Sequence, residues 1–189
     1  MKWNFLCFLV FGFMTSPALS ADESFRFGVQ TSLNRYTSYD PVGPTAGSSG
    51  LSISGIALYN LGRESRAMFN IDRDSYSMQG SKTNVGQDAT SIGADASYQT
   101  MLRLTRTWKP WVGVGLGYNS TKYKNRFVYT AGGAKTFYAD RETTGMSVLL
   151  NTNSEWVFNR DWDLGLQLQF AKTISNNSSI FRVGIYAVY

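Results

Sequence analysis

The sequence predicts an all-β chain that folds as an eight-stranded antiparallel up-and-down barrel. Apolar residues recur at every second position in eight segments of the 189-residue chain, which is the period of a β-strand. The connections between these segments are alternately long and short, as in a meander whose tight turns gather at one end. Aromatic residues make up 15% of the chain and there are only 4 Pro, a composition that favours strands.

The start of the chain differs in composition from the rest. Lys2 supplies a positive charge, residues 5–14 are almost all apolar, and small residues precede a cleavage point after Ser20. This apolar run is about half of the ~20 residues that a transmembrane helix needs. We therefore expect a secretory signal peptide at residues 1–20 and one barrel domain at residues 21–189. Cys7 is the only cysteine and lies in the signal, so the exported domain is expected to fold without a disulfide.

The strands of the exported domain are expected wherever the alternation is sustained. The second of them is the least regular, because Ile56 and Leu58 interrupt its pattern, and the fifth alternates large apolar residues with glycine. In chain order we expect strands at 25–34, 51–61, 66–74, 92–103, 111–118, 146–158, 162–170 and 181–189. Turns are expected at 62–65, 105–109 and 159–161. The long connections are expected to include loops at 37–50 and 77–89 and a long hairpin at 122–142.

The two faces of these strands differ in kind. One face is apolar, with Leu164, Leu166 and Leu168 in a row, and it carries aromatic residues toward both ends. A soluble barrel would turn this face inward. However, the interior of an eight-stranded barrel is just wide enough to be filled by side chains, which suits the small and charged residues of the other face. Two aromatic girdles about 25 Å apart are typical of membrane interfaces. The sequence therefore predicts an eight-stranded antiparallel up-and-down transmembrane β-barrel with lipid on the outside.

The charges on the inner face are expected to form an interior charge network of Arg26, Arg66, Asp72, Asp74, Asp95, Arg103, Glu155, Asp163 and Arg182. We expect the three Asp residues of this set to pair with Arg182 as a plug, because unpaired charges in so narrow a barrel would be costly. The alternative is that these carboxylates bind a hard cation such as Ca²⁺. The remaining members are expected to cluster near the turn end.

The chain resembles small outer-membrane β-barrel proteins of the OmpA membrane-domain and OmpX-like type. The resemblance lies in the segment WKPWVGVGLGY at 108–118 and in the aromatic last strand, and it extends over the exported domain. It implies a cell outer membrane location in a Gram-negative envelope, with both termini in the periplasm. It also implies that the outer-membrane insertion machinery reads a C-terminal signal made of Phe181, Val183, Ile185 and Tyr189.

Several classes of function are disfavoured by residues that the sequence lacks. The chain contains no His, so a Ser or water nucleophile would lack its usual base, and we expect no enzymatic activity, including modification of lipid A. No cofactor and no metal site are expected. The formal net charge of +5 is too mild and too scattered to indicate binding of nucleic acid. A narrow passive channel, or porin, remains the alternative function, although eight strands leave little lumen.

The hairpin at 122–142 is the most informative segment for function. It is basic and aromatic, as a surface for lipopolysaccharide or for a host or cell-surface ligand would be. Its candidate surface-binding residues are Lys122, Lys124, Arg126, Phe127, Tyr129, Lys135, Phe137 and Tyr138. The alternative is a solvated hairpin whose charges pair with one another. We therefore expect a monomer with a structural or surface-binding role, such as adhesion or interaction with outer-membrane lipid and the envelope.

Overall fold

The computed structural model describes residues 25–45, 47–174 and 178–189. The expected signal peptide lies outside the described residues. All regular structure in the described part of the chain is β-strand. The strands are β1 (Phe25–Thr37), β2 (Tyr39–Asp40), β3 (Gly43–Pro44), β4 (Ser48–Gly62), β5 (Ser65–Met78), β6 (Gly86–Met101), β7 (Trp111–Tyr129), β8 (Lys135–Tyr138), β9 (Arg141–Val157), β10 (Asp163–Thr173) and β11 (Ser179–Val188).

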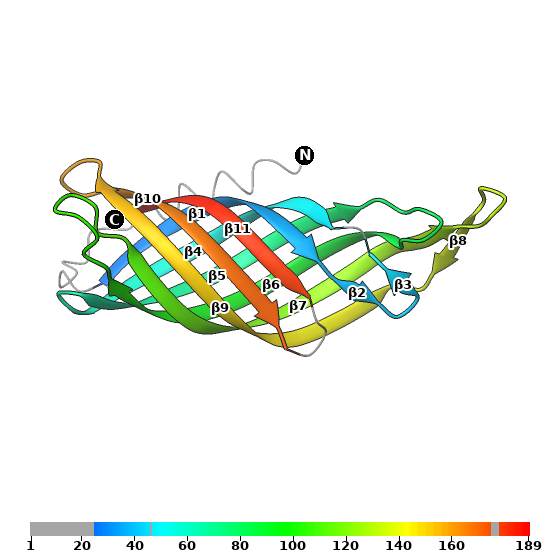
Figure 1. Ribbon diagram of the computed structural model, residues 1–189, viewed down its shortest axis with the longest axis horizontal. Helices are drawn as coiled ribbons and strands as arrows, with labels where there is room; N and C mark the ends of the chain where they lie inside the picture. Colours follow the sequence, from blue (N-terminus) through cyan, green and yellow to red (C-terminus); the bar gives the residue numbers. More distant parts are fainter. Residues whose placement is uncertain (1–24, 46, 175–177) are drawn as a thin grey trace, which may run out of the picture.

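Eight of these strands form a closed barrel in which every strand is antiparallel to its neighbours (Figure 1). The order around the barrel is β1, β4, β5, β6, β7, β9, β10 and β11, and β11 pairs again with β1. This closure leaves no unpaired sheet edge in the spanning part. The fold class predicted from the alternation is therefore confirmed.

The two ends of the barrel differ in how far the strands extend past it. Connections of 2, 9 and 5 residues join β4 to β5, β6 to β7 and β9 to β10 at the end where β1 begins and β11 finishes, which we call the turn end (Figure 1). At the opposite, loop end, β7 and β9 continue well past the barrel, and β8 pairs with the far part of β7. β7 has 19 residues, whereas a spanning strand needs about 9–11. The loop end therefore carries a hairpin that projects beyond the membrane-spanning part.

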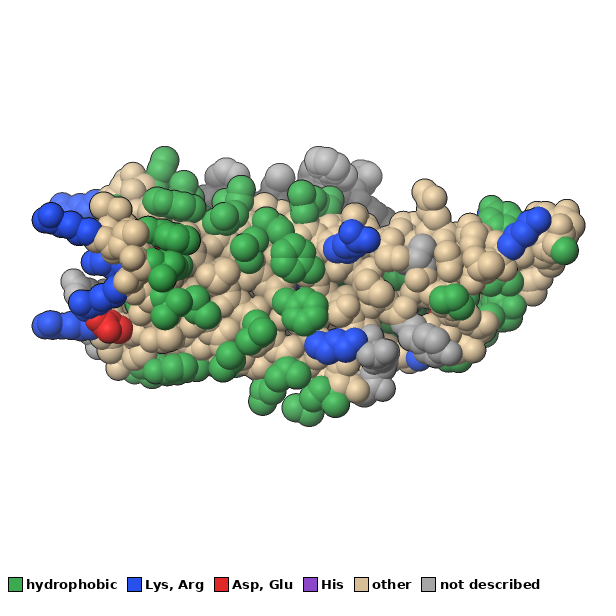
Figure 2. Space-filling model, viewed as in Figure 1, with side chains coloured by type: hydrophobic (Ala, Val, Ile, Leu, Met, Phe, Trp, Pro, Cys, Tyr) green, Lys and Arg blue, Asp and Glu red, His purple; other side chains and the backbone are tan. Residues whose placement is uncertain are grey.

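The barrel is apolar outside and polar inside. Large apolar side chains are exposed over its whole circumference, and Figure 2 shows them gathered on the barrel body. The exposed outward-facing residues include Phe27, Val29, Leu33, Leu51, Ile53, Phe69, Ile71, Ile92, Val114, Leu116, Met146, Val148, Leu150, Leu166, Leu168, Phe170, Phe181, Val183 and Ile185. This belt, hereafter the apolar belt, fits a wall that faces lipid. Among the described residues, no helix is long and apolar enough to cross a membrane.

Several details differ from what the sequence predicted. The loop expected at 37–50 contains the short β2–β3 hairpin, and the strands on both sides of the loop at 77–89 are longer than the alternation suggested. Ile56 and Leu58, which interrupt the pattern of β4, face the interior and pack with Met68, Tyr186 and Val188. The interior near the turn end is therefore partly apolar.

Candidate functional site

The middle of the interior is occupied by what we call the Arg182 network: Arg182, Asp72, Asp74 and Asp95. The Arg182 guanidinium lies 2.6 Å from Asp72, 2.7 Å from Asp74 and 3.8 Å from Asp95. β5, β6 and β11 bring these residues together because each of them falls on the inward parity of its strand. The geometry is that of the expected plug.

Amide donors compensate the excess of carboxylates in this network. Asn34 donates to Asp74 at 2.8 Å, Asn70 donates to Asp95 at 2.7 Å, and Gln169 donates to Asp95 at 3.1 Å. Arg182 also donates to the Gln169 side-chain oxygen at 3.2 Å. Within the described residues, no group of three or more His, Cys, Asp or Glu side chains is placed to hold a metal ion. The carboxylates are therefore held by Arg182 and by neighbouring amides.

A second group, the Glu155 network, fills the interior nearer the turn end. Glu155 accepts hydrogen bonds from Arg66 at 2.5 Å, from Arg26 at 3.3 Å and from the Tyr186 hydroxyl at 2.6 Å. Arg26 also pairs with Asp163. The guanidinium of Arg66 is fully buried and lies 4.1 Å from the centre of the Trp111 ring. This arrangement brings together four of the five residues that were expected to cluster at this end.

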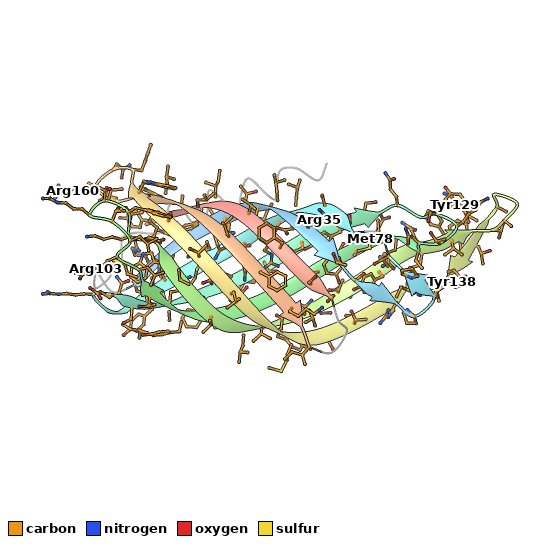
Figure 3. All side chains as sticks on the ribbon, in the orientation of Figure 1. Arg35, Met78, Arg103, Tyr129, Tyr138 and Arg160 are labelled. Atoms are coloured by element: carbon orange, nitrogen blue, oxygen red, sulfur yellow. The ribbon has the colours of Figure 1, made fainter. Side chains whose placement is uncertain are left out.

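Arg103, the fifth, lies outside the interior. β6 ends at Met101, so the inward parity of the strand does not extend to position 103. The Arg103 side chain is 68% exposed in the turn and pairs with Glu64, and Figure 3 shows it at the turn end with Arg160. The prediction that Arg103 belongs to the interior network was therefore wrong, because it extended the alternation past the end of the strand.

Aromatic side chains close the interior toward the loop end. Tyr36 stacks on Tyr76 with ring centroids 4.6 Å apart, and its hydroxyl lies 2.7 Å from that of Tyr123. Sequence reasoning did not single out these tyrosines, although Tyr36 and Tyr76 share the parity of Asn34 and Asp74 and could have been placed inside on that basis. A cavity of about 20 Å³ remains beside Arg182, with room for about one water molecule.

The hairpin at the loop end presents a distinct aromatic and basic face, formed by Phe127, Tyr129, Lys135 and Phe137. Phe127 pairs with Phe137 across the hairpin, and Tyr129 pairs with Lys135. The Lys135 ammonium lies 4.4 Å from the centre of the Phe127 ring and 5.6 Å from that of Tyr129. Phe137 is 67% exposed. We call this surface the hairpin face; Figure 3 places Tyr129 on the projecting hairpin.

The base of the hairpin is anchored by an ion pair that the sequence did not predict. Asn125 has a positive φ of 52° and is an extra residue in β7, which turns Arg126 inward. The Arg126 side chain is 8% exposed and donates to both oxygens of Asp40 and to the backbone oxygen of Ala139. Its guanidinium also lies 6.0 Å from the Tyr138 ring. The prediction that Arg126 is a surface-binding residue was therefore wrong.

The other predicted surface residues lie on the outside of β7. Lys122 is exposed and lies 3.8 Å from Glu142, its cross-strand neighbour in β9. Lys124 is also exposed, and it lies opposite Asp88 of β6. In the last strand, Phe181, Val183, Ile185 and Tyr189 all face outward, as the alternation predicted.

Tyr189 also contributes to closure. Its backbone exchanges two hydrogen bonds with Phe27, at 2.8 and 3.1 Å, and its ring lies 5.5 Å from that of Trp162. These contacts connect the last residue to the first strand and to the turn that precedes β10. They are structural contacts; whether this strand is read during insertion stays a prediction.

The fold is shared with several outer-membrane proteins of known structure. The chain is similar to neisserial surface protein A, NspA (18% identity, TM-score 0.54, covering 87% of this chain and 95% of that one). It is also similar to Ail, the attachment invasion locus protein of Yersinia pestis (9% identity, TM-score 0.53, covering 88% of this chain and 97% of that one). Ail has also been solved in complex with the heparin analogue sucrose octasulfate. A third similar structure is the outer membrane protein OprG from Pseudomonas aeruginosa (8% identity, TM-score 0.55, covering 88% of this chain and 95% of that one).

No protein-family model matches the chain, and no curated protein matches it in sequence. The likeness to the solved structures is therefore one of fold. A closed barrel with an outward apolar belt satisfies every condition for spanning a bilayer with strands. The chain therefore has the fold of small outer-membrane β-barrel proteins, a closed eight-stranded barrel with an apolar outer wall.

Proposed function

We propose that this protein is a monomeric surface-binding barrel that captures anionic glycans through its hairpin face. In this proposal both termini lie in the periplasm and the loop end faces outward. The observation that carries the proposal is the hairpin face, in which Lys135 and Phe137 are exposed and Phe127 and Tyr129 are partly exposed. It projects beyond the barrel on the Arg126–Asp40 anchor. Exposed aromatic patches on a soluble surface mark interaction sites.

The charge of the hairpin supports an anionic ligand. Residues 122–142 contain five basic and two acidic side chains, and Lys122 already pairs with Glu142. Lys135 has aromatic neighbours and no acidic partner among the described residues. A sulfate or phosphate group is able to bind its ammonium while a sugar ring lies against Phe137. The complex of Ail with a heparin analogue supports the choice of a sulfated probe.

The filled interior supports binding over conduction. The Arg182 network, the Glu155 network and the tyrosines around Tyr36 occupy successive levels of the lumen. The cavity beside Arg182 has room for about one water molecule. We therefore expect no stepwise conductance in planar-bilayer recordings of the refolded chain. Regular conductance steps that change on replacing Arg182 would support the channel instead.

Binding to immobilised heparin tests the proposed function. In one variant, residues 128–136 are replaced by an Asn-Gly turn, so that the Phe127–Phe137 pair is joined directly and the Arg126–Asp40 anchor is kept. We expect this variant and Lys135→Gln to lose at least tenfold in affinity. Lys109→Gln removes the same charge at the turn end and is expected to bind like wild type. Equal binding by all four proteins would refute the role of the hairpin.

A further inference from the structure

The edge of the apolar belt nearest the loop end carries basic residues in a regular pattern. In four strands, β1, β5, β7 and β10, the outward-facing apolar row is followed toward the loop end by a basic side chain. These side chains are Arg35, Arg73, Lys122 and Lys172. Arg35 follows Leu33, Arg73 follows Ile71 and Lys172 follows Phe170, each at the next outward position, whereas Ser120 lies between Tyr118 and Lys122.

The four strands alternate around the barrel with β4, β6, β9 and β11, which supply none of these residues. Neighbouring members of the ring are thus two strands apart, or about 10 Å along the wall. Three members have a polar cross-strand neighbour on one side: Arg35 lies beside Ser49, Lys172 beside Ser179, and Lys122 beside Thr90. On the other side Arg35 lies beside Phe181 and Lys172 beside Val148, as expected at the boundary between the apolar belt and the polar loops. The result is a basic ring that encircles the barrel. Figure 3 shows Arg35 on β1, partway between the two ends of the barrel.

Acidic side chains are sparse at this level. Glu142 pairs with Lys122 at 3.8 Å. Arg35 and Arg73 are exposed and form no ion pair with any described residue. Arg73 lies between Ile53 and Ile92, so its charged group is at the boundary between the apolar belt and the polar loops. A long basic side chain in that position extends its charge to the lipid headgroups.

We propose that this basic ring binds the phosphate groups of phosphorylated lipopolysaccharide in the outer leaflet. The site uses no residue of the hairpin face, but it rests on the proposed orientation with the loop end outward. Lipopolysaccharide fits because its acyl chains would cover the apolar belt while its phosphates meet the ring. Arginine and lysine are the side chains that bind phosphate best. Four such groups, spread around the circumference, would order a shell of lipid on all sides.

Retention of lipid A by the refolded full chain in detergent tests this inference. The ring variant is Arg35→Gln, Arg73→Gln, Lys122→Gln and Lys172→Gln together. The matched control is Arg63→Gln, Arg103→Gln, Arg106→Gln and Arg160→Gln, which removes the same charge at the turn end. The probes are purified bisphosphorylated lipid A and its dephosphorylated form. Wild type and control are expected to retain at least tenfold more bisphosphorylated lipid A than the ring variant, with no difference for the dephosphorylated lipid.

Two outcomes would overturn the inference. The first is that the ring variant retains as much bisphosphorylated lipid A as wild type. The second is that the turn-end control loses as much as the ring variant, which would show that retention depends on the net charge of the protein and not on the ring. Heat-dependent migration on a gel verifies that each variant is folded. If the quadruple variant does not fold, the pairs Arg35→Gln with Arg73→Gln and Lys122→Gln with Lys172→Gln are each expected to lose part of the retention. The variant lacking residues 128–136 is expected to retain lipid A normally, so failure of this inference and failure of the proposed function are distinguishable.

Discussion

At the scale of single residues, Arg182 determines the charge balance of the interior. It faces Asp72, Asp74 and Asp95 and is itself 6% exposed. Removing one partner from a buried ion pair costs more than the pair contributes, because the remaining charge cannot be solvated. We expect Arg182→Met to lower the free energy of unfolding by about 3–5 kcal/mol. Urea titration of the refolded barrel in micelles, followed by the heat-dependent gel shift, measures this loss.

Arg103→Gln is the control for that prediction. Arg103 also forms an ion pair, but its side chain is 68% exposed and that of Glu64 is 49% exposed. Exposed pairs contribute about 0–1 kcal/mol, so its unfolding midpoint should hardly change. Similar losses for both variants would mean that burial of the Arg182 network adds nothing to the cost of breaking it.

A glycine provides a second prediction at this scale. A side chain at Gly165 would overlap the ring of Tyr186, whose hydroxyl is held 2.6 Å from Glu155. We expect Gly165→Ala to cost about 1–3 kcal/mol in the same urea titration, as overpacking does. Gly55→Ala is the control, because a side chain there meets no atom within 4 Å. In a Tyr186→Leu background, where the overlapping ring is absent, the same Gly165→Ala change should cost almost nothing; an equal cost in both backgrounds would place the strain elsewhere.

At the scale of elements, the hairpin beyond the barrel depends on one buried ion pair at its base. Arg126 and Asp40 join the far part of β7 to the β2–β3 hairpin. Asp40→Asn replaces charge-assisted hydrogen bonds by neutral ones, and we expect trypsin cleavage after Lys135 and Arg141 to become faster on the order of tenfold. The urea midpoint of the barrel should be unchanged. Glu142→Gln, which breaks the exposed pair with Lys122, should leave cleavage at the wild-type rate.

The elements also show how far the sequence could predict the structure. All eight spanning strands follow from period two, because lipid on one side and a narrow interior on the other constrain every residue of a spanning strand. Outside the membrane this constraint is absent, and there the predictions failed. One extra residue at Asn125 reversed the parity of Arg126, and the end of β6 released Arg103 into a turn. The Asp40–Arg126 contact joins distant segments and has no local signal.

At the scale of the whole molecule, the barrel exchanges the usual places of core and surface. Its large apolar side chains face outward, toward lipid. Its interior is stabilised by ion pairs, amides and tyrosines that bridge strands far apart in sequence. Closure makes this possible, because pairing of β11 with β1 satisfies the last row of backbone groups. The integrity of the interior therefore depends on a contact between the two ends of the described chain.

Cysteine cross-linking tests this closure. Thr37 and Ser179 are paired in β1 and β11 at the loop end, where a water-soluble reagent has access. Because Cys7 is the only native cysteine, a refolded chain that lacks residues 1–20 has no competing thiol. We expect Thr37→Cys with Ser179→Cys to react with a short bifunctional maleimide, so that the chain migrates faster on a denaturing gel. Thr37→Cys with Ser120→Cys places the second thiol on β7, four strands from β1 in either direction, and should not cross-link. Cross-linking of the second pair, or of neither, would contradict the closed strand order.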